Sequence, residues 1–129
     1  MATPEELYQR YVYAGAMTRD AEAVAALFTD DGVYEAPLVP PGHPFPRRLA
    51  GRDEIRRGLS EYYRRPQPTT GPVDVERTRY VLHRPEPGVL IAEVDTVLVD
   101  HDPISLVQIF RVRDGLVASL RDYFDPAVV

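Results

Sequence analysis

Two polar residues near the C-terminus, Gln108 and Asp122, have the type and position for acid–base chemistry, because they interrupt an apolar pattern. They fall in two predicted strands, Ile104 to Arg113 and Leu116 to Phe124, joined at Arg113-Asp114-Gly115. A glycine in the left-handed position of a three-residue loop predicts a type I turn followed by a bulge. A carboxylate in apolar surroundings has a raised pKa, because burial disfavours its charged form. Such a group suits a general acid or base that works near neutral pH.

The predicted turn decides which side chains of this hairpin share a face, because directly paired residues point the same way. It pairs Val112 with Leu116, Phe110 with Ala118, Gln108 with Leu120, and Leu106 with Asp122. The more apolar face, which we expect to line the interior, consists of Leu106, Gln108, Phe110, Val112, Leu116, Ala118, Leu120, Asp122 and Phe124. Two interpretations of Asp122 stay open: an acid–base group in a pocket, or a structural residue at the pocket edge that pairs with an arginine.

A second pair of carboxylates, Glu93 and Asp95, lies two positions apart on the predicted strand Val89 to Val99. Side chains two apart on a strand point to the same face, so these two can form an acid–base pair. They can equally lie at a dimer interface or meet arginines on the outer face of the sheet, and we prefer a structural role. The candidate partners are Arg77, Arg79 and Arg111.

The histidines do not have the spacing of a metal site, because His43, His83 and His101 are far apart in the sequence. Asp100-His101-Asp102 is rich in ligand atoms, but aspartate is ordinary in a β-turn. We therefore expect a solvent-exposed turn there and no metal.

A proline-rich segment surrounds His43. Pro37 precedes the segment Leu38 to Leu49, which contains further prolines and cannot form regular structure. Long loops inside compact domains are often functional lids. We place this loop over the mouth of a pocket.

Residue types that the sequence lacks narrow the chemistry further. It has no cysteine and no lysine, which excludes thiolate chemistry, Schiff bases and a Walker-type phosphate loop. No Gly-x-Ser-x-Gly motif of a serine hydrolase is present. The net charge of −5 at pH 7 disfavours nucleic acid and anionic lipid as partners. Since no apolar run could span a bilayer and no signal peptide is evident, we expect a cytoplasmic protein.

Three helices are predicted ahead of the strands. The first begins at a capping box formed by Thr3 and Glu6, and the second begins at the cap residue Asp20. The predicted spans are Pro4 to Met17 for the first helix, Asp20 to the turn Asp30-Asp31-Gly32 for the second, Val33 to Ala36 for a short strand, and a third helix between Gly51 and the closing prolines Pro66 and Pro68.

The strands that follow should form an antiparallel meander. It opens at Gly71-Pro72, continues with strands Val73 to Arg84 and Val89 to Val99, and ends with the hairpin. Helices that segregate to one side of an antiparallel sheet define an α+β fold. A strongly curved sheet of this kind leaves a cavity beneath its helices. With no internal repeat and no domain boundary, residues 1–129 are expected to form a single domain.

Segments near both ends of the chain carry a family resemblance. They are Gln9-Arg10-Tyr11-Val12, Ala26-Leu27-Phe28-Thr29-Asp30-Asp31, a strand ending at Pro37, Phe110-Arg111-Val112, Gly115-Leu116-Val117-Ala118-Ser119-Leu120-Arg121 and Arg121-Asp122-Tyr123-Phe124-Asp125-Pro126. In them the chain resembles the SnoaL-like and ketosteroid isomerase-like proteins of the nuclear transport factor two-like fold. The resemblance implies a cone with three N-terminal helices packed on a curved antiparallel sheet. It also implies a homodimer, which we place on the outer sheet face at Val107, Ile109 and Val117.

The resemblance also suggests roles for particular residues. Ketosteroid isomerase uses an aspartate base beside a tyrosine and a protonated aspartate. By position, the tyrosine falls on Tyr11, the base on Ala36 and the protonated aspartate on Gln108. The tyrosine is kept, the base is missing, and an amide replaces the second donor. Asp122 is the best-placed substitute base, with Glu35 a weaker candidate; SnoaL-like cyclases likewise use a pocket carboxylate without a cofactor.

The preferred function is therefore a cofactor-independent acid–base enzyme, a polyketide cyclase or an isomerase, that acts on a small apolar carbonyl compound. Its catalytic residues would be Asp122, Tyr11 and Gln108. The residues expected to contact the substrate are Tyr34, Ala36, His43, Phe45, Leu59, Tyr62, Phe110, Leu120 and Phe124. The alternative is a non-catalytic module for ligand binding or dimerisation, which the missing base at Ala36 supports.

Overall fold

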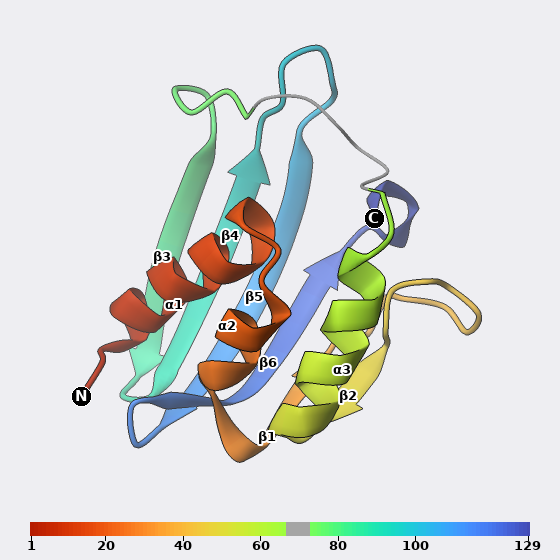
Figure 1. Ribbon diagram of the computed structural model, residues 1–129. Coiled ribbons are helices and arrows are strands. Elements are labelled where there is room, and N and C mark those ends of the chain that lie inside the picture. Colours follow the sequence, from red (N-terminus) through yellow and green to blue (C-terminus); the bar gives the residue numbers. More distant parts are fainter. Residues whose placement is uncertain (67–72) are drawn as a thin grey trace.

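In the computed structural model of the protein, which describes residues 1–66 and 73–129, helices cover one face of a six-stranded sheet (Figure 1). The elements are α1 (Pro4–Val12), η1 (Tyr13–Met17), α2 (Ala21–Ala26), β1 (Phe28–Glu35), β2 (Arg48–Ala50), α3 (Arg52–Tyr63), β3 (Arg79–Glu86), β4 (Val89–Thr96), β5 (Ile104–Arg113), β6 (Leu116–Phe124) and η2 (Pro126–Val128). The predicted helix stop at Pro68 and the strand opening at Gly71-Pro72 lie outside the described residues.

The helices α1 and α2 begin where the sequence places them, because their predicted caps form. The amide of Glu6 donates to Thr3 Oγ1 and the amide of Thr3 donates to Glu6 Oε1, each over 3.2 Å. The carboxylate of Asp20 caps α2 by accepting from the amide of Ala23 at 3.1 Å. The predicted first helix is continuous to Met17, but its last turn, η1, is π-helical. None of the helices within the described ranges is long and apolar enough to cross a membrane.

The sheet has the order β2-β1-β6-β5-β4-β3, so the predicted meander from β3 to β6 is confirmed. The expectation of a purely antiparallel sheet is wrong, because β1 runs parallel to β6. β1 begins at Phe28 rather than at the predicted Val33, and Asp30-Asp31-Gly32 lie inside it. The chain leaves α2 beside the start of β6, where the amide of Val117 donates to the carbonyl of Leu27, and both strands then run in the same direction.

Two other segments also differ from the prediction. The segment Leu38 to Leu49 is largely irregular, as expected, but its end joins the short edge strand β2, which pairs with β1. The predicted strand Val73 to Arg84 becomes regular only from Arg79, at the start of β3.

The β5–β6 hairpin has the predicted bounds but a different turn. Asp114 and Gly115 have positive φ angles of 53° and 74°, which are typical of a two-residue type I′ turn. Ala118 is then bulged out of the ladder, because Val112 pairs with Val117 and the next residue, Arg111, pairs with Ser119. Beyond the bulge, the register is shifted by two residues relative to the prediction.

The corrected pairs are Phe110 with Leu120, Gln108 with Asp122, and Leu106 with Phe124. A shift of two leaves each of these side chains on its predicted face. The bulge changes the faces at the turn end: Val117 is fully buried in the core, and Leu116 and Ala118 are not. Val117 therefore cannot contribute to an outer dimer face, which corrects that prediction.

Candidate functional site

Asp122 is a carboxylate in the centre of an apolar core. It lies on β6, is only 6% exposed, and has the core residues Leu120 and Phe124 on either side of it on the inner face. Gln108, its direct partner on β5, is also buried. Arg121 next to it points to the opposite face, where it lies over the ring of Tyr123. The predicted inward orientation of Asp122 and Gln108 is confirmed.

Tyr34 makes the closest polar contact of this carboxylate. Its hydroxyl donates to Asp122 Oδ2 over 2.7 Å from the neighbouring strand β1. The other oxygen, Oδ1, is buried and accepts no hydrogen bond from any described residue. A buried acceptor without a partner is rare in folded proteins and commonly marks a site that receives a ligand or water.

Burial raises the pKa of Asp122 from 3.8 to about 6, since the charged form is poorly solvated there. The Tyr34 hydroxyl acts in the opposite direction because it stabilises the carboxylate. The Gln108 amide, facing it across the ladder, also lowers this pKa, although it does not reach hydrogen-bonding geometry with Oδ1. The result is a carboxyl group that changes its protonation near neutral pH, as a general acid or base requires.

Two further phenols reach the same point from the helices. Burial raises the pKa of Tyr11 on α1 well above its usual value, and the charge of Asp122 raises it further. Burial also raises the pKa of Tyr63 on α3 to about 12; the Arg19 guanidinium opposes this and Asp122 reinforces it. Both phenols therefore stay protonated near neutral pH and can donate hydrogen bonds to an oxygen that becomes negatively charged.

The side chains packed around Asp122 are called the chamber here, and the proline-rich loop supplies part of its aromatic wall. The ring of Phe45 lies 4.6 Å from that of Tyr62, 5.0 Å from that of Phe124 and 6.0 Å from that of Tyr34, measured between centroids. Phe110 contributes on the other side, with its ring edge-on to Tyr11 at 5.5 Å. The remaining residues expected to contact a substrate are buried in the same core: Ala36, Leu59 and Leu120.

The ring nitrogens of His43 are both used within the protein, so its expected contact with a substrate stays a prediction that could involve only its carbon atoms. Its Nδ1 accepts from the amide of Phe45 at 2.9 Å, and its Nε2 lies 2.8 Å from the carbonyl oxygen of Pro126. This arrangement requires the neutral tautomer with a proton on Nε2. His43 therefore connects the loop to η2 and holds Phe45 in place.

The other candidate carboxylates lie on the outer face. Glu93 pairs with His83, and Asp95 accepts from the Ser105 hydroxyl at 2.6 Å, both exposed to solvent. The structural interpretation of this pair is confirmed, although the partners are not the predicted arginines.

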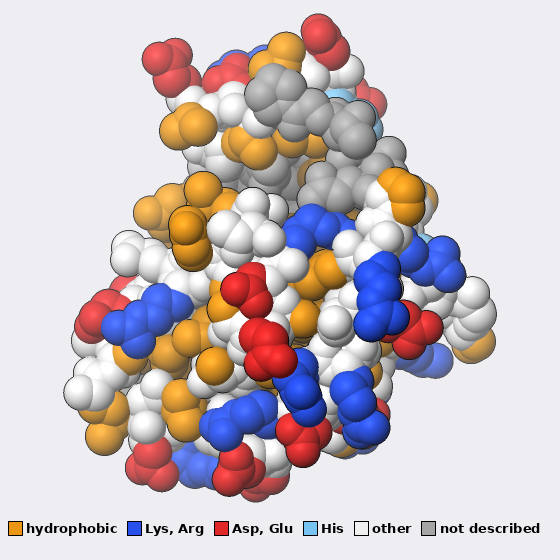
Figure 2. Space-filling view, in the orientation of Figure 1, with side chains coloured by type: hydrophobic (Ala, Val, Ile, Leu, Met, Phe, Trp, Pro, Cys, Tyr) orange, Lys and Arg blue, Asp and Glu red, His pale blue; other side chains and the backbone are white. Residues whose placement is uncertain are grey.

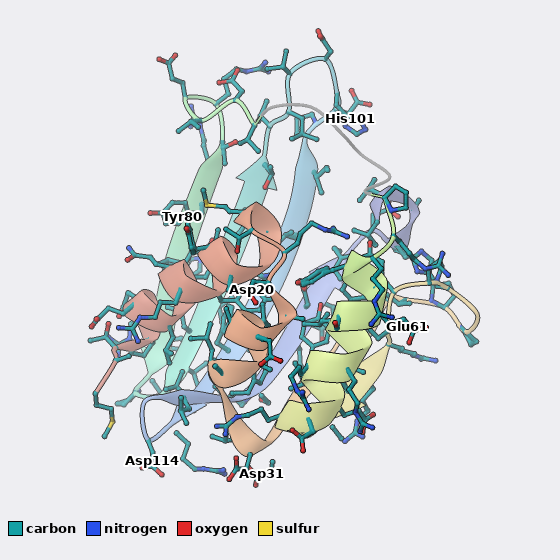
Figure 3. The ribbon with its side chains drawn as sticks, viewed as in Figure 1. Asp20, Asp31, Glu61, Tyr80, His101 and Asp114 are labelled. Atoms are coloured by element: carbon teal, nitrogen blue, oxygen red, sulfur yellow. The ribbon has the colours of Figure 1, made fainter. Side chains whose placement is uncertain are left out.

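Glu35, the weaker candidate base, lies 4.0 Å from Arg48 on one side and 4.0 Å from Arg121 on the other, also on the outer face. It is therefore excluded as a base for the chamber. Within residues 1–66 and 73–129, no group of three His, Asp or Glu side chains could hold a metal ion. His101 lies in a turn at the end of the molecule opposite to Asp114 (Figure 3).

Sequence reasoning did not include Tyr63 among the site residues and did not assign the polar role of Tyr34. Helical spacing after Ile55 and Leu59 does predict Tyr63 on the inward face of α3, but it does not show that its phenol lies near Asp122. The contact between Tyr34 and Asp122 joins residues 88 positions apart, so no local pattern contains it.

Surface grooves flank the chamber without reaching its carboxylate. One, of about 470 Å³, lies between α2 and α3 and has Tyr63, Arg19 and Asp20 in its lining. Another, of about 480 Å³, lies between α1 and α2 around Tyr13 and Leu27. Asp122 lines neither of them. Acidic and basic side chains are interspersed over this helical face (Figure 2), so it presents no uniform charge.

Solved structures share this fold. A candidate isomerase from Bacillus subtilis is 22% identical, with 96% of this chain and 87% of that chain covered and a TM-score of 0.68. A candidate ketosteroid isomerase from Kribbella flavida is 25% identical, with 92% and 75% covered and a TM-score of 0.56. A protein with a ketosteroid isomerase-like fold from Catenulispora acidiphila, solved with trimethylamine, is 18% identical, with 99% and 91% covered and a TM-score of 0.64. No curated protein sequence matches the chain significantly.

These likenesses agree with the helices and the mixed sheet described above, which together are an α+β fold of the nuclear transport factor two-like type. The family match extends over residues 8–120 and carries the description SnoaL-like domain. It ends two residues before Asp122, so the role of that carboxylate depends on its geometry and not on the match. With most of its length matched, the chain belongs to the SnoaL-like domain family.

Proposed function

We propose that this protein is a cofactor-independent acid–base enzyme that acts on a small, mostly apolar carbonyl compound, as a polyketide cyclase or an isomerase does. The observation that carries the proposal is the buried carboxyl group of Asp122, with one oxygen unpartnered and phenols around it. Its pKa of about 6 lets it accept and donate a proton near neutral pH.

The chemistry would begin at the carbonyl oxygen of the bound compound. Tyr11 and Gln108 would donate hydrogen bonds to that oxygen and stabilise the charge that develops on it. Asp122 in its charged form would remove a proton from the carbon next to the carbonyl, which leaves an enolate and a neutral carboxyl group. The donors lower the energy of the enolate most, which is the condition for catalysis.

Two reactions return this proton from Asp122 to the bound molecule. In an isomerisation, Asp122 returns the proton to a different carbon of the enolate. In a cyclisation, the enolate carbon attacks a second carbonyl group of the same molecule, and Asp122 gives the proton to the resulting alkoxide. Neither outcome needs an oxidant, a reductant or a second substrate, which agrees with a cofactor-independent reaction.

The lining of the chamber suits an apolar molecule. Phe110, Leu120 and Phe124 belong to the apolar core that surrounds Asp122, and Phe45 packs against it. Burial of apolar surface against them would supply affinity at roughly 25 cal/mol per Å². Because these residues are packed against one another, a substrate would enter by displacing Phe45, whose loop lies at the margin of the fold.

The second candidate function is a non-catalytic module that binds a small ligand or dimerises. It is favoured by Ala36, which stands where related isomerases carry their base. A homodimer would use the outer sheet face, where Val107 and Ile109 are half-buried and Ile109 lies beside Ile91 of β4.

Proton exchange on a simple ketone tests the leading proposal. The probe is 2-tetralone in D₂O, whose α-protons exchange for deuterium when a base removes them, followed by proton NMR between pH 5 and 8. We expect the protein to accelerate exchange with a midpoint near pH 6, and Asp122→Asn to lower the rate at least about 100-fold. Asp95→Asn, an exposed carboxylate on β4, is the matched control and should keep the wild-type rate.

The alternatives give different results in the same experiment. Exchange that is equal in wild type and Asp122→Asn would contradict the role of Asp122. Chemical-shift changes that show 2-tetralone bound, with no accelerated exchange at any pH, would favour the ligand-binding module.

A further inference from the structure

The two oxygens of Asp122 are chemically different in the folded protein. Oδ2 accepts a hydrogen bond of 2.7 Å from Tyr34, whereas Oδ1 has no partner among the described residues. Both belong to a side chain that is almost completely buried, so bulk water does not make them equivalent. A bound molecule would therefore find Oδ1 free to accept a hydrogen bond and Oδ2 already occupied by Tyr34.

Tyr34 is held in place by the strands on both sides of it. It is 1% exposed, and its strand β1 is bonded on both sides, to Leu49 of β2 and to Leu120 of β6. The ring of Phe45 packs against it. Burial, followed by the charge of Asp122, raises the pKa of Tyr34 well above its usual value, so its hydroxyl remains a donor across the neutral range.

We propose that Tyr34 is a positioning residue, which holds Oδ2 so that Oδ1 is the oxygen of Asp122 that exchanges a proton with the bound molecule. The inference rests on the proposed function for its kinetic consequence, but the hold on the carboxylate can be measured without any substrate. Tyr34 itself touches Asp122 and is not assigned a contact with the reacting atoms.

One consequence is that the acid and the base are the same atom. When Asp122 is neutral, its proton lies on Oδ1, because Oδ2 already faces the hydroxyl hydrogen of Tyr34. When Asp122 is charged, Oδ1 is the oxygen with a free lone pair. A proton is thus taken from and returned to the bound molecule at one point, which requires little movement of either partner.

In the described residues, no charged group lies near enough to Asp122 to compete with Tyr34 in setting the pKa of this carboxyl group. The other groups that face Asp122 are the amide of Gln108 on β5, the phenol of Tyr11 on α1 and the phenol of Tyr63 on α3. All three are uncharged near neutral pH. Loss of the Tyr34 hydroxyl should therefore appear directly in the titration of Asp122.

The test is the variant Tyr34→Phe, with the Asp122 carboxyl carbon observed by carbon-13 NMR after selective labelling of aspartate. The wild-type midpoint is expected near pH 6. In Tyr34→Phe it should rise by about one pH unit or more, because a hydrogen bond to a charged group is lost. Tyr62→Phe is the matched control: Tyr62 also packs on Phe45, but Asp122 does not act on its phenol. That control should leave the midpoint unchanged.

A folded Tyr34→Phe protein with an unchanged midpoint would overturn the inference. If the variant does not fold, the inference can be tested on the wild-type protein instead. Its Tyr34 Cζ resonance should shift with the midpoint of Asp122, and a resonance insensitive to that titration would overturn the inference.

The kinetic arm separates this inference from the proposed function. In the 2-tetralone assay, Tyr34→Phe should move the pH profile upward by the same amount as the NMR midpoint, with a lower plateau rate and a nearly unchanged KM. A moved midpoint with no exchange by the wild type would refute the proposed enzyme and still support the hold of Tyr34 on Oδ2. A profile that stays in place although the midpoint moves would refute Oδ1 as the exchanging atom.

Discussion

The stability of Asp122→Asn relative to wild type should increase as the pH rises. Folding raises the pKa of Asp122 from 3.8 to about 6, so the folded state binds this proton more tightly than the unfolded chain. The stability that this proton contributes is fully present below about pH 4 and is lost as the pH rises through 6. A difference of about 2 pH units corresponds to about 3 kcal/mol at high pH.

Asparagine also has a cost that does not depend on pH. Its carbonyl oxygen can still accept from Tyr34, but its amide group then lies where Oδ1 was, without a partner. An unsatisfied buried donor costs about 1–3 kcal/mol. This cost is the same at every pH, so the informative quantity is the change with pH in the stability difference between variant and wild type.

Urea unfolding of both proteins at pH 4.5 and at pH 8 measures this change. We expect the stability of Asp122→Asn, relative to wild type, to be about 2 kcal/mol higher at pH 8 than at pH 4.5, which is most of the full effect. Asp95→Asn removes an exposed carboxylate and should show a much smaller change. A difference for Asp122→Asn that is constant with pH would refute the claim that burial dominates its titration. A difference that falls with pH would mean that the charged carboxylate is stabilised in the fold.

Two further substitutions test the surroundings of the chamber. His43→Ala removes the link between the loop and η2. It should lower the free energy of unfolding by about 1–2 kcal/mol for its two hydrogen bonds, which urea unfolding measures. Binding of 2-tetralone should become faster, because Phe45 is released. Ile109→Glu places a charge on the outer sheet face and should convert a homodimer to a monomer in light scattering after size-exclusion chromatography, whereas an identical mass for wild type and variant would exclude that face as the interface.

Local sequence patterns were sufficient to predict the bounds of those helices and strands that carry a capping residue or a clear alternation. The capping residues Thr3 and Asp20 placed both helix starts, and β5 and β6 have the predicted bounds. The inward orientation of Asp122 follows from the same kind of signal, because alternation along one strand needs no knowledge of distant contacts.

The turn shows why a partly wrong prediction still placed the carboxylate correctly. A three-residue loop was expected, but Asp114 and Gly115 both adopt positive φ angles and close a two-residue turn. Together with the bulge at Ala118, this moves the pairing by two residues, so that Asp122 faces Gln108 and not Leu106. An error of one residue would have turned Asp122 to the outer face, and the pattern alone did not distinguish these registers near the turn.

The contacts that give the chamber its chemistry were beyond the reach of local patterns. β1 lies beside β6 in a parallel pair, and this pairing alone brings Tyr34 to Asp122. A parallel neighbour leaves no turn signal in the sequence, in contrast to a hairpin. The sequence predicts Tyr34 as a substrate contact, but its hydrogen bond to the carboxylate follows only from the three-dimensional pairing of the strands.

The sheet order explains why this site can be both buried and well defined. β6 has a bonded neighbour on each side, and each neighbour contributes one polar partner: Tyr34 from β1 and Gln108 from β5. The backbone ladder therefore positions the carboxyl group, its donor and the amide, which is more exact than a site built on loops. Tyr11 and Tyr63 come from helices, and Phe45 from a loop that His43 fastens to the C-terminal end. Entry of a molecule should accordingly displace the helices and the loop, while the strands keep the acid–base centre in place.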